Sequence, residues 1–140
     1  MGAMGDEAEA IHDSVYPRHH KLGINRPPMA VQNMSLKARY TPDRQHVDSL
    51  VEVMGCGRDG IIKIKVEKVV ALLQWSATDP IKLFLWNSHR KTWAIGDLDP
   101  FVDALFQHGI YGLFPEGKPY IGLHVDHVPF DWTKYDPPEE

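Results

Sequence analysis

The sequence of 140 residues lacks a second cysteine, an excess of positive charge and a long apolar run. Because Cys56 stands alone, it can form neither an internal disulfide nor a cysteine-based metal cluster, which favours a reducing compartment. A formal net charge of -4 argues against nucleic-acid binding through bulk charge. No stretch approaches the roughly 18 apolar residues of a membrane span, and no hydrophobic signal core stands at the start. These absences predict a globular protein of the cytoplasm or nucleus without a membrane partner.

The clearest pattern in the sequence is a β-hairpin between Ile81 and Ile95. Ile81, Leu83 and Leu85 would face one side of a strand and Lys82, Phe84 and Trp86 the other, and a returning strand begins at Trp93. Residues 87–91 are polar and form the predicted tip. Since both faces of the hairpin are apolar, either the sheet is covered on both sides or one face binds a partner. The preferred interpretation is coverage by the arm or the tail, with Trp86 and Trp93 paired across the strands.

A short helix is predicted directly after the hairpin. Asp99 is placed as its N-cap, Pro100 as its first residue and Gly109 as the residue beyond its end. The inward face predicted for this helix is apolar and consists of Phe101, Val102, Leu105 and Phe106.

Shorter patterns predict the remaining elements. A strand over residues 61–66 has an apolar face and a basic face, the latter with Lys63 and Lys65, and a helix of about two turns follows from Glu67. Residues 55–60 predict a glycine-rich turn. Further strands are predicted over residues 34–40, 46–54 and 120–125.

Together these elements predict a single α+β domain over residues 34–132, with a small mixed sheet and one or two short helices. Residues 1–33 have no sustained apolar period and are interpreted as a flexible N-terminal arm, whose first five residues look like an expression-tag remnant. Residues 133–140 are interpreted as an extended acidic tail. The aromatic residues near this tail are expected to dock on the domain or on a partner: Phe130, Trp132 and Tyr135.

The order of strand, glycine turn, strand, helix, hairpin, short helix and strand is similar to the ubiquitin-like β-grasp. Residues 81–125 most resemble the second half of a PB1-type domain, in which an acidic, capped helix follows a hairpin. The residues in comparable places are Asp97, Asp99, Asp103, Ala104 and Phe106. The hairpin tip, which is acidic in that family, carries Arg90 and Lys91 here. The resemblance implies a β-grasp fold and a module that binds other proteins and does no chemistry.

The predicted function is a non-enzymatic protein-interaction or scaffolding module that binds another protein or itself, with no cofactor, metal or catalytic residue. The predicted partner-binding residues are Lys63, Lys65, Trp86, Arg90, Lys91, Trp93, Asp97, Asp99 and Asp103. The basic strand of one copy would meet the acidic helix start of another, head to tail. Trp86 or Trp93 would supply the apolar anchor of this contact.

Two alternatives from other classes stay open. His124, Asp126 and His127 offer nitrogen and oxygen ligands for zinc or iron, as in a small metal-dependent enzyme. A local basic patch would instead bind nucleic acid, although the acidic net charge makes this partner the less favoured one. That patch would consist of Lys63, Lys65, Lys82, Arg90 and Lys91.

Overall fold

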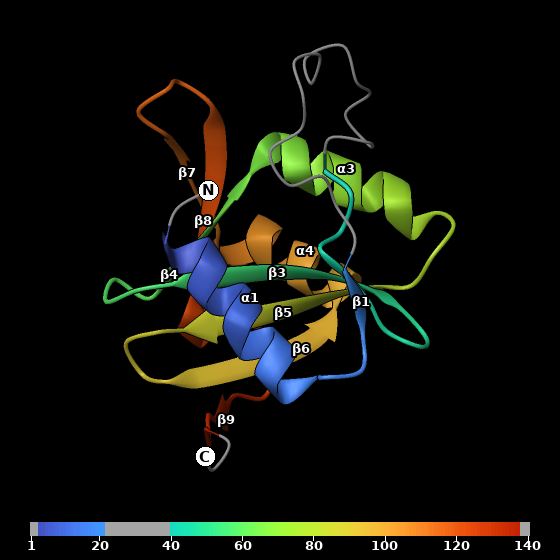
Figure 1. The fold of residues 1–140 in the computed structure, drawn as a ribbon. Helices are drawn as coiled ribbons and strands as arrows, with labels where there is room; N and C mark the ends of the chain where they lie inside the picture. Colours follow the sequence, from blue (N-terminus) through green and yellow to red (C-terminus); the bar gives the residue numbers. More distant parts are fainter. Residues whose placement is uncertain (1–2, 22–39, 138–140) are drawn as a thin grey trace.

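The structure of this chain, a computed structural model, describes residues 3–21 and 40–137. A mixed six-stranded sheet with helices on both faces stands beside a second sheet of three strands (Figure 1). The α+β class predicted from the sequence is confirmed. The elements are α1 (Ala3–Val15), β1 (His20–Lys21), β2 (Arg44–Gln45), β3 (Leu50–Cys56), β4 (Ile61–Lys65), α3 (Val66–Ser76), β5 (Ile81–Asn87), β6 (Thr92–Asp97), α4 (Leu98–His108), β7 (Ile110–Leu113), β8 (Pro119–His124), the 3-10 turn η2 (Val125–His127) and β9 (Thr133–Lys134).

The six-stranded sheet has the order β1-β2-β3-β5-β6-β9. Its centre is the parallel pair β3 and β5, which are joined through β4 and α3. β5 and β6 form the predicted hairpin, and Trp86 lies directly opposite Trp93. The predictions of a hairpin and of a tryptophan pair are therefore confirmed.

Both faces of the hairpin are covered. Leu83 and Leu85 pack into a core with α3 and α4, whereas Phe84 and Trp86 pack into a second core beneath α1. In Figure 1, α1 crosses the near face of the sheet and α4 lies behind it. The alternation of side chains along one strand thus feeds two separate cores, and the preferred interpretation of the apolar hairpin is confirmed.

The helix α1 corrects the prediction of a flexible arm, which is wrong for residues 3–15. Met4, Ala8, Ile11 and Val15 recur at helical spacing and lie against the sheet. These four residues form a narrow apolar stripe among small and polar residues. The helix is therefore stabilised mainly by its packing against the sheet and less by intrinsic helix propensity. The strand predicted over residues 34–40, and with it the predicted start of the domain, lies outside the described residues except for Tyr40, which is in a turn.

The helix α4 begins earlier than predicted. Its N-cap position is occupied by Asp97, whose side chain makes no capping hydrogen bond, and Asp99 lies within the first turn. The early start is explained by Leu98, which is buried and so adds an apolar contact to the first turn. Gly109 follows the last helical residue as predicted. Phe106 was wrongly assigned to the inward face, because it is 70% exposed.

The second sheet has the order β4-β8-β7, and β4 and β8 confirm two predicted strands. Ile62 and Ile64 of β4 are buried opposite Leu123 and Ile121 of β8, respectively. The edge strand β7 was not predicted. β3 and β4, the two strands before α3, belong to different sheets and do not pair with each other, and the β-grasp stays a prediction.

The C-terminal segment docks on its own domain. β9 pairs with β6, and Tyr135 meets the Trp86 ring edge-on with ring centroids 5.5 Å apart. Phe130 lies against Gly96, where any side chain would collide with its ring. Within the described residues, no helix combines the length and apolarity needed to cross a bilayer.

Candidate functional site

Of the two predicted aromatic anchors, Trp86 is buried and Trp93 is half-buried. Trp86 is 1% exposed, and its Nε1 donates a hydrogen bond to Glu7 Oε1 over 2.8 Å. Trp93 is half-buried and stacks on Phe84, with ring centroids 5.6 Å apart. The prediction that Trp86 anchors a partner is wrong, because α1 and Tyr135 already cover its ring.

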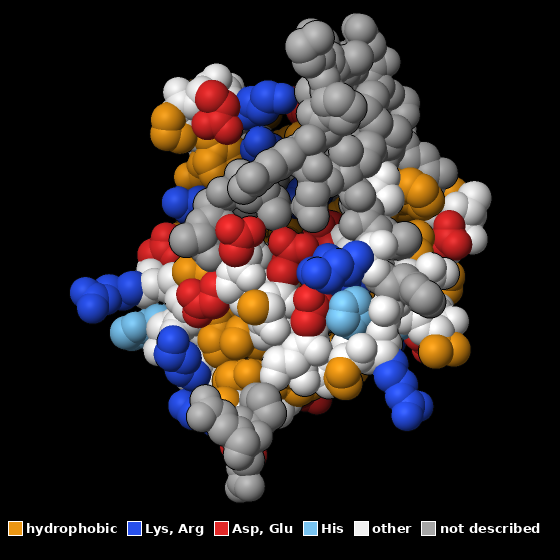
Figure 2. All heavy atoms as spheres, in the orientation of Figure 1, with side chains coloured by type: hydrophobic (Ala, Val, Ile, Leu, Met, Phe, Trp, Pro, Cys, Tyr) orange, Lys and Arg blue, Asp and Glu red, His pale blue; other side chains and the backbone are white. Residues whose placement is uncertain are grey.

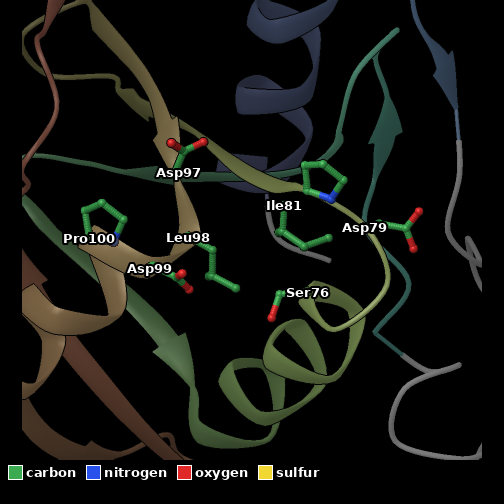
Figure 3. A pocket seen from close by; sticks show the side chains of 8 residues that line it. Ser76, Asp79, Ile81, Asp97, Leu98, Asp99 and Pro100 are labelled. Atoms are coloured by element: carbon green, nitrogen blue, oxygen red, sulfur yellow. The ribbon is translucent and has the colours of Figure 1, made fainter.

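Two of the three predicted acidic residues, Asp97 and Asp99, line a cleft of about 360 Å³ between the end of α3 and the start of α4. Figure 3 shows Asp97, Asp99 and Asp79 around this cleft, together with Ser76. Asp103 is exposed on α4 and is not among the lining residues. Three carboxylates at one cleft suit a basic group better than an acidic one.

The predicted basic residues Lys63 and Lys65 share the outer face of β4. Lys63 Nζ lies 5.5 Å from the centre of the Tyr120 ring, and Lys65 Nζ lies 5.9 Å from that of Phe114. Their ion pairs are long, 3.9 Å to Asp59 and 3.8 Å to Glu116. Such exposed pairs contribute little to stability, so a partner's carboxylate can replace them at small cost.

The five basic residues of the nucleic-acid alternative do not form one patch. Lys82 stands at the start of β5, whereas Arg90 and Lys91 stand beyond its end, about 20 Å away along a strand of this length. Arg90 pairs with Asp126 over 3.1 Å. Lys63 and Lys65 belong to the other sheet.

The metal alternative at His124, Asp126 and His127 is not supported by the geometry. Asp126 pairs with Arg90, and His127 stacks on His108 with ring centroids 4.1 Å apart. His124 Nδ1 accepts a hydrogen bond from the backbone amide of Asp126 over 3.1 Å. Among the described residues, the ligand atoms of these three side chains do not come together as a group.

The main exposed apolar surface was missed by the sequence analysis. Ile110, Tyr111 and Leu113 of β7 are between 69% and 74% exposed, and Phe106 lies just before them in the chain. Because β7 pairs only with β8 among the described strands, its other edge is open. The β7–β8 hairpin stands out from the body in Figure 1, and hydrophobic side chains follow it in Figure 2. The apolar run Ile110-Tyr-Gly-Leu113 after a helix-ending glycine was the available signal.

A histidine and aspartate cluster lies where α1 ends, and it was also missed. Asp13 Oδ1 lies 2.9 Å from His12 Nδ1 and 3.1 Å from His19 Nε2. The other ring nitrogen of His12, Nε2, lies 2.8 Å from His46 Nε2. Arg44 donates from Nε and Nη2 to the two oxygens of Asp13. His12 and Asp13 belong to the segment interpreted as a flexible arm, so the sequence did not place them near His46.

The environment of this cluster sets its charge. Burial lowers the pKa of His12 to about 4, although the hydrogen bond to Asp13 opposes the shift. Burial would raise the pKa of Asp13, but hydrogen bonds from Arg44 and His12 outweigh it and bring the pKa to about 2. At neutral pH His12 is therefore neutral and Asp13 is ionised.

A second polar cluster, built around the buried Glu52, joins β3 to α3. Lys68 Nζ lies 2.6 Å from Glu52 Oε2, and Asp43 Oδ2 accepts a hydrogen bond from the Val53 amide over 2.9 Å. Burial raises the pKa of Asp43 to about 8, and the charge and hydrogen bond of Glu52 add to the shift. Cys56 is also buried, which raises its thiol pKa to about 11 and makes it a poor nucleophile.

No family model, curated protein or solved structure matches this chain.

Proposed function

We propose that this chain is a protein-interaction module that binds an extended segment of a partner protein along β7. The observation that carries the proposal is the open edge of β7, which exposes apolar side chains on both faces. Four of the seven large apolar side chains that are exposed in the described part of the chain fall within residues 106–113. Exposed apolar surface concentrated on one element is typical of a binding site.

The chemistry of a strand edge explains how the segment would bind. Outward-facing amide and carbonyl groups of β7 offer main-chain hydrogen bonds to an added fourth strand. Tyr111 and Leu113 lie on the same face of the three-stranded sheet as Ile121. Ile110 lies on the opposite face, together with Lys63. The bound segment would therefore carry apolar side chains on both of its faces. Because β7 has only four residues, we expect a weak and reversible complex.

The basic face of β4 favours an acidic segment. An added strand would lie about 14 Å from β4, since three strand spacings of about 4.8 Å separate them. Lys63 and Lys65 would thus act mainly by steering the segment toward the edge rather than by direct contact. The lone, buried Cys56 supports a reducing compartment for the module, such as the cytoplasm or nucleus.

The proposal is tested by selecting ligands from a displayed library of ten-residue peptides and mapping them by amide chemical shifts. We expect acidic segments with alternating apolar residues, shifts concentrated on β7, and at least tenfold weaker binding to Ile110→Lys/Leu113→Lys. The control Val70→Lys, which changes an exposed residue of α3, should bind normally. Failure to select any segment, or shifts confined to the cleft at Asp97 and Asp99, would contradict the proposal.

A second copy of the chain is the other partner to test. Sedimentation equilibrium at low and high salt measures its mass against concentration for the wild type, for the β7 variant and for Lys63→Glu/Lys65→Glu. Self-association lost only in the β7 variant would identify pairing between β7 edges. Self-association lost in the lysine variant and at high salt would support the head-to-tail arrangement. A mass of one chain throughout would leave a different protein as the partner.

A further inference from the structure

We propose that His12, Asp13 and His19 bind a divalent transition-metal ion, and that Zn²⁺ suits the site. One ligand atom from each of the three side chains lies within 4.8 Å of the other two, the sole such group in the part of the chain that the structure describes. Two histidine nitrogens and a carboxylate oxygen are a donor set that zinc accepts, with a fourth position left for water.

The distances suit an ion after a small movement. Asp13 Oδ1 lies 2.9 Å from His12 Nδ1 and 3.1 Å from His19 Nε2. Ligands about 2.0–2.1 Å from a tetrahedral zinc ion are roughly 3.3 Å apart. The two distances to Asp13 Oδ1 therefore need to grow by only a few tenths of an ångström to admit the ion, and the ligand atoms of His12 and His19 lie within 4.8 Å of each other.

The other polar atom of each ligand is already held in place. His19 Nδ1 lies 2.6 Å from the Tyr16 carbonyl oxygen, and His12 Nε2 lies 2.8 Å from His46 Nε2. Asp13 Oδ2 accepts a hydrogen bond from Arg44 Nη2 over 3.2 Å. Metal-binding histidines and carboxylates are commonly oriented by outer contacts of this kind, which fix the ring and raise its basicity.

The charge around the site also permits a cation. Arg44 brings a positive charge next to Asp13, but its Nη1 lies 2.9 Å from Glu9 Oε1. The two carboxylates of Glu9 and Asp13 carry two negative charges against the single positive charge of Arg44. A net negative charge therefore remains next to the site and would attract a cation. On binding, Asp13 Oδ1 would exchange the Arg44 Nε hydrogen bond for the metal while Oδ2 keeps its contact with Nη2.

The ion would join the last turn of α1 to the segment that leads into β1. His12 and Asp13 are neighbours in α1, and His19 directly precedes β1. His12 is fully buried, whereas the Asp13 side chain is 27% exposed and leaves a side open to solvent. Binding would therefore clamp residues 12–19 and stabilise the docking of α1 by mass action.

The test is a titration of the full chain, without an added histidine tag, with Co²⁺ followed by visible absorption and with Zn²⁺ followed by calorimetry. We expect one ion per chain, tetrahedral Co²⁺ bands, and a melting temperature that rises with Zn²⁺ and returns with a chelator. Asp13→Asn and His19→Gln should each weaken binding by at least tenfold. The control His124→Gln/His127→Gln removes two other histidines and should bind as the wild type does.

Circular dichroism in the presence of chelator confirms that each variant is folded before it is titrated. Absence of binding to the folded wild type would overturn the proposal. So would affinity that is lost in the His124→Gln/His127→Gln control but kept in His19→Gln. Since β7 takes no part in this site, the outcome is independent of the proposed protein-interaction function.

Discussion

The two faces of the six-stranded sheet are covered in different ways. Toward α3 and α4 the contacts are mostly apolar, with Leu83 and Leu85 at the centre. Beneath α1, apolar rings lie beside hydrogen bonds that join distant parts of the chain. Trp86 donates such a bond to Glu7, and Arg44 donates another to Asp13. The first face depends on local patterns of apolar residues, and the second depends on particular pairs. The difference explains why the sequence predicted the helices on the first face, whereas on the second face it predicted coverage but not the helix α1 that provides it.

The largest expected effect is on the apolar face. Leu83→Ala and Leu85→Ala each remove a fully buried side chain and leave a cavity, which should lower the free energy of unfolding by about 2–5 kcal/mol. Urea denaturation measures this loss. The control is Leu73→Ala on α3, where the side chain is 39% exposed and we expect a change below about 1 kcal/mol. Equal losses in all three variants would contradict the assignment of the apolar core.

The two faces should also respond differently to pH. The pKa of Asp43 is raised to about 8 in the folded protein from an ordinary value of 3.8, so the folded state holds its proton more tightly than the unfolded state. The resulting stability is complete below pH 4 and is lost as the pH rises through 8. The pKa of Asp13 on the α1 face is lowered to about 2, so its stability is lost only as the pH falls from 3.8 through 2.

Comparison of pH 5 with pH 7 isolates the contribution of Asp43. At about 1.4 kcal/mol per pH unit, the wild type should lose roughly 2 kcal/mol more than Asp43→Asn over this interval. Denaturation curves of both proteins at the two pH values measure the difference. Parallel changes in the two proteins would show that Asp43 titrates normally.

The elements from residue 61 to residue 125 were largely predictable because each carries its own signal. Alternation marks β4 and β5, and Gly109 marks the end of α4. The start of α4 was misplaced because the burial of Leu98, rather than a side-chain cap, decides it. Tertiary contact overrides local preference at such positions.

The candidate sites were harder to predict than the fold. Lys63 and Lys65 were correctly placed on an exposed strand face, because alternation along β4 reports which side is buried. Trp86 was misassigned as an anchor although coverage of the hairpin was the preferred interpretation, because the sequence does not show which element covers which face. The cluster at His12 brings together residues that are 34 positions apart, and no local pattern encodes such a contact.

The smallest effect is expected at the link between α1 and the sheet. Glu7→Ala removes the acceptor of the Trp86 Nε1 hydrogen bond and leaves a buried donor unsatisfied, so the free energy of unfolding should fall by about 1–2 kcal/mol. Glu7→Gln keeps an acceptor oxygen and should lose less, because only the charge is removed. Asp6→Ala changes an exposed neighbour on the same helix and should cost less than about 0.5 kcal/mol. Urea denaturation followed by tryptophan fluorescence compares the three variants, and a Glu7→Ala protein as stable as Asp6→Ala would show that α1 does not depend on this contact.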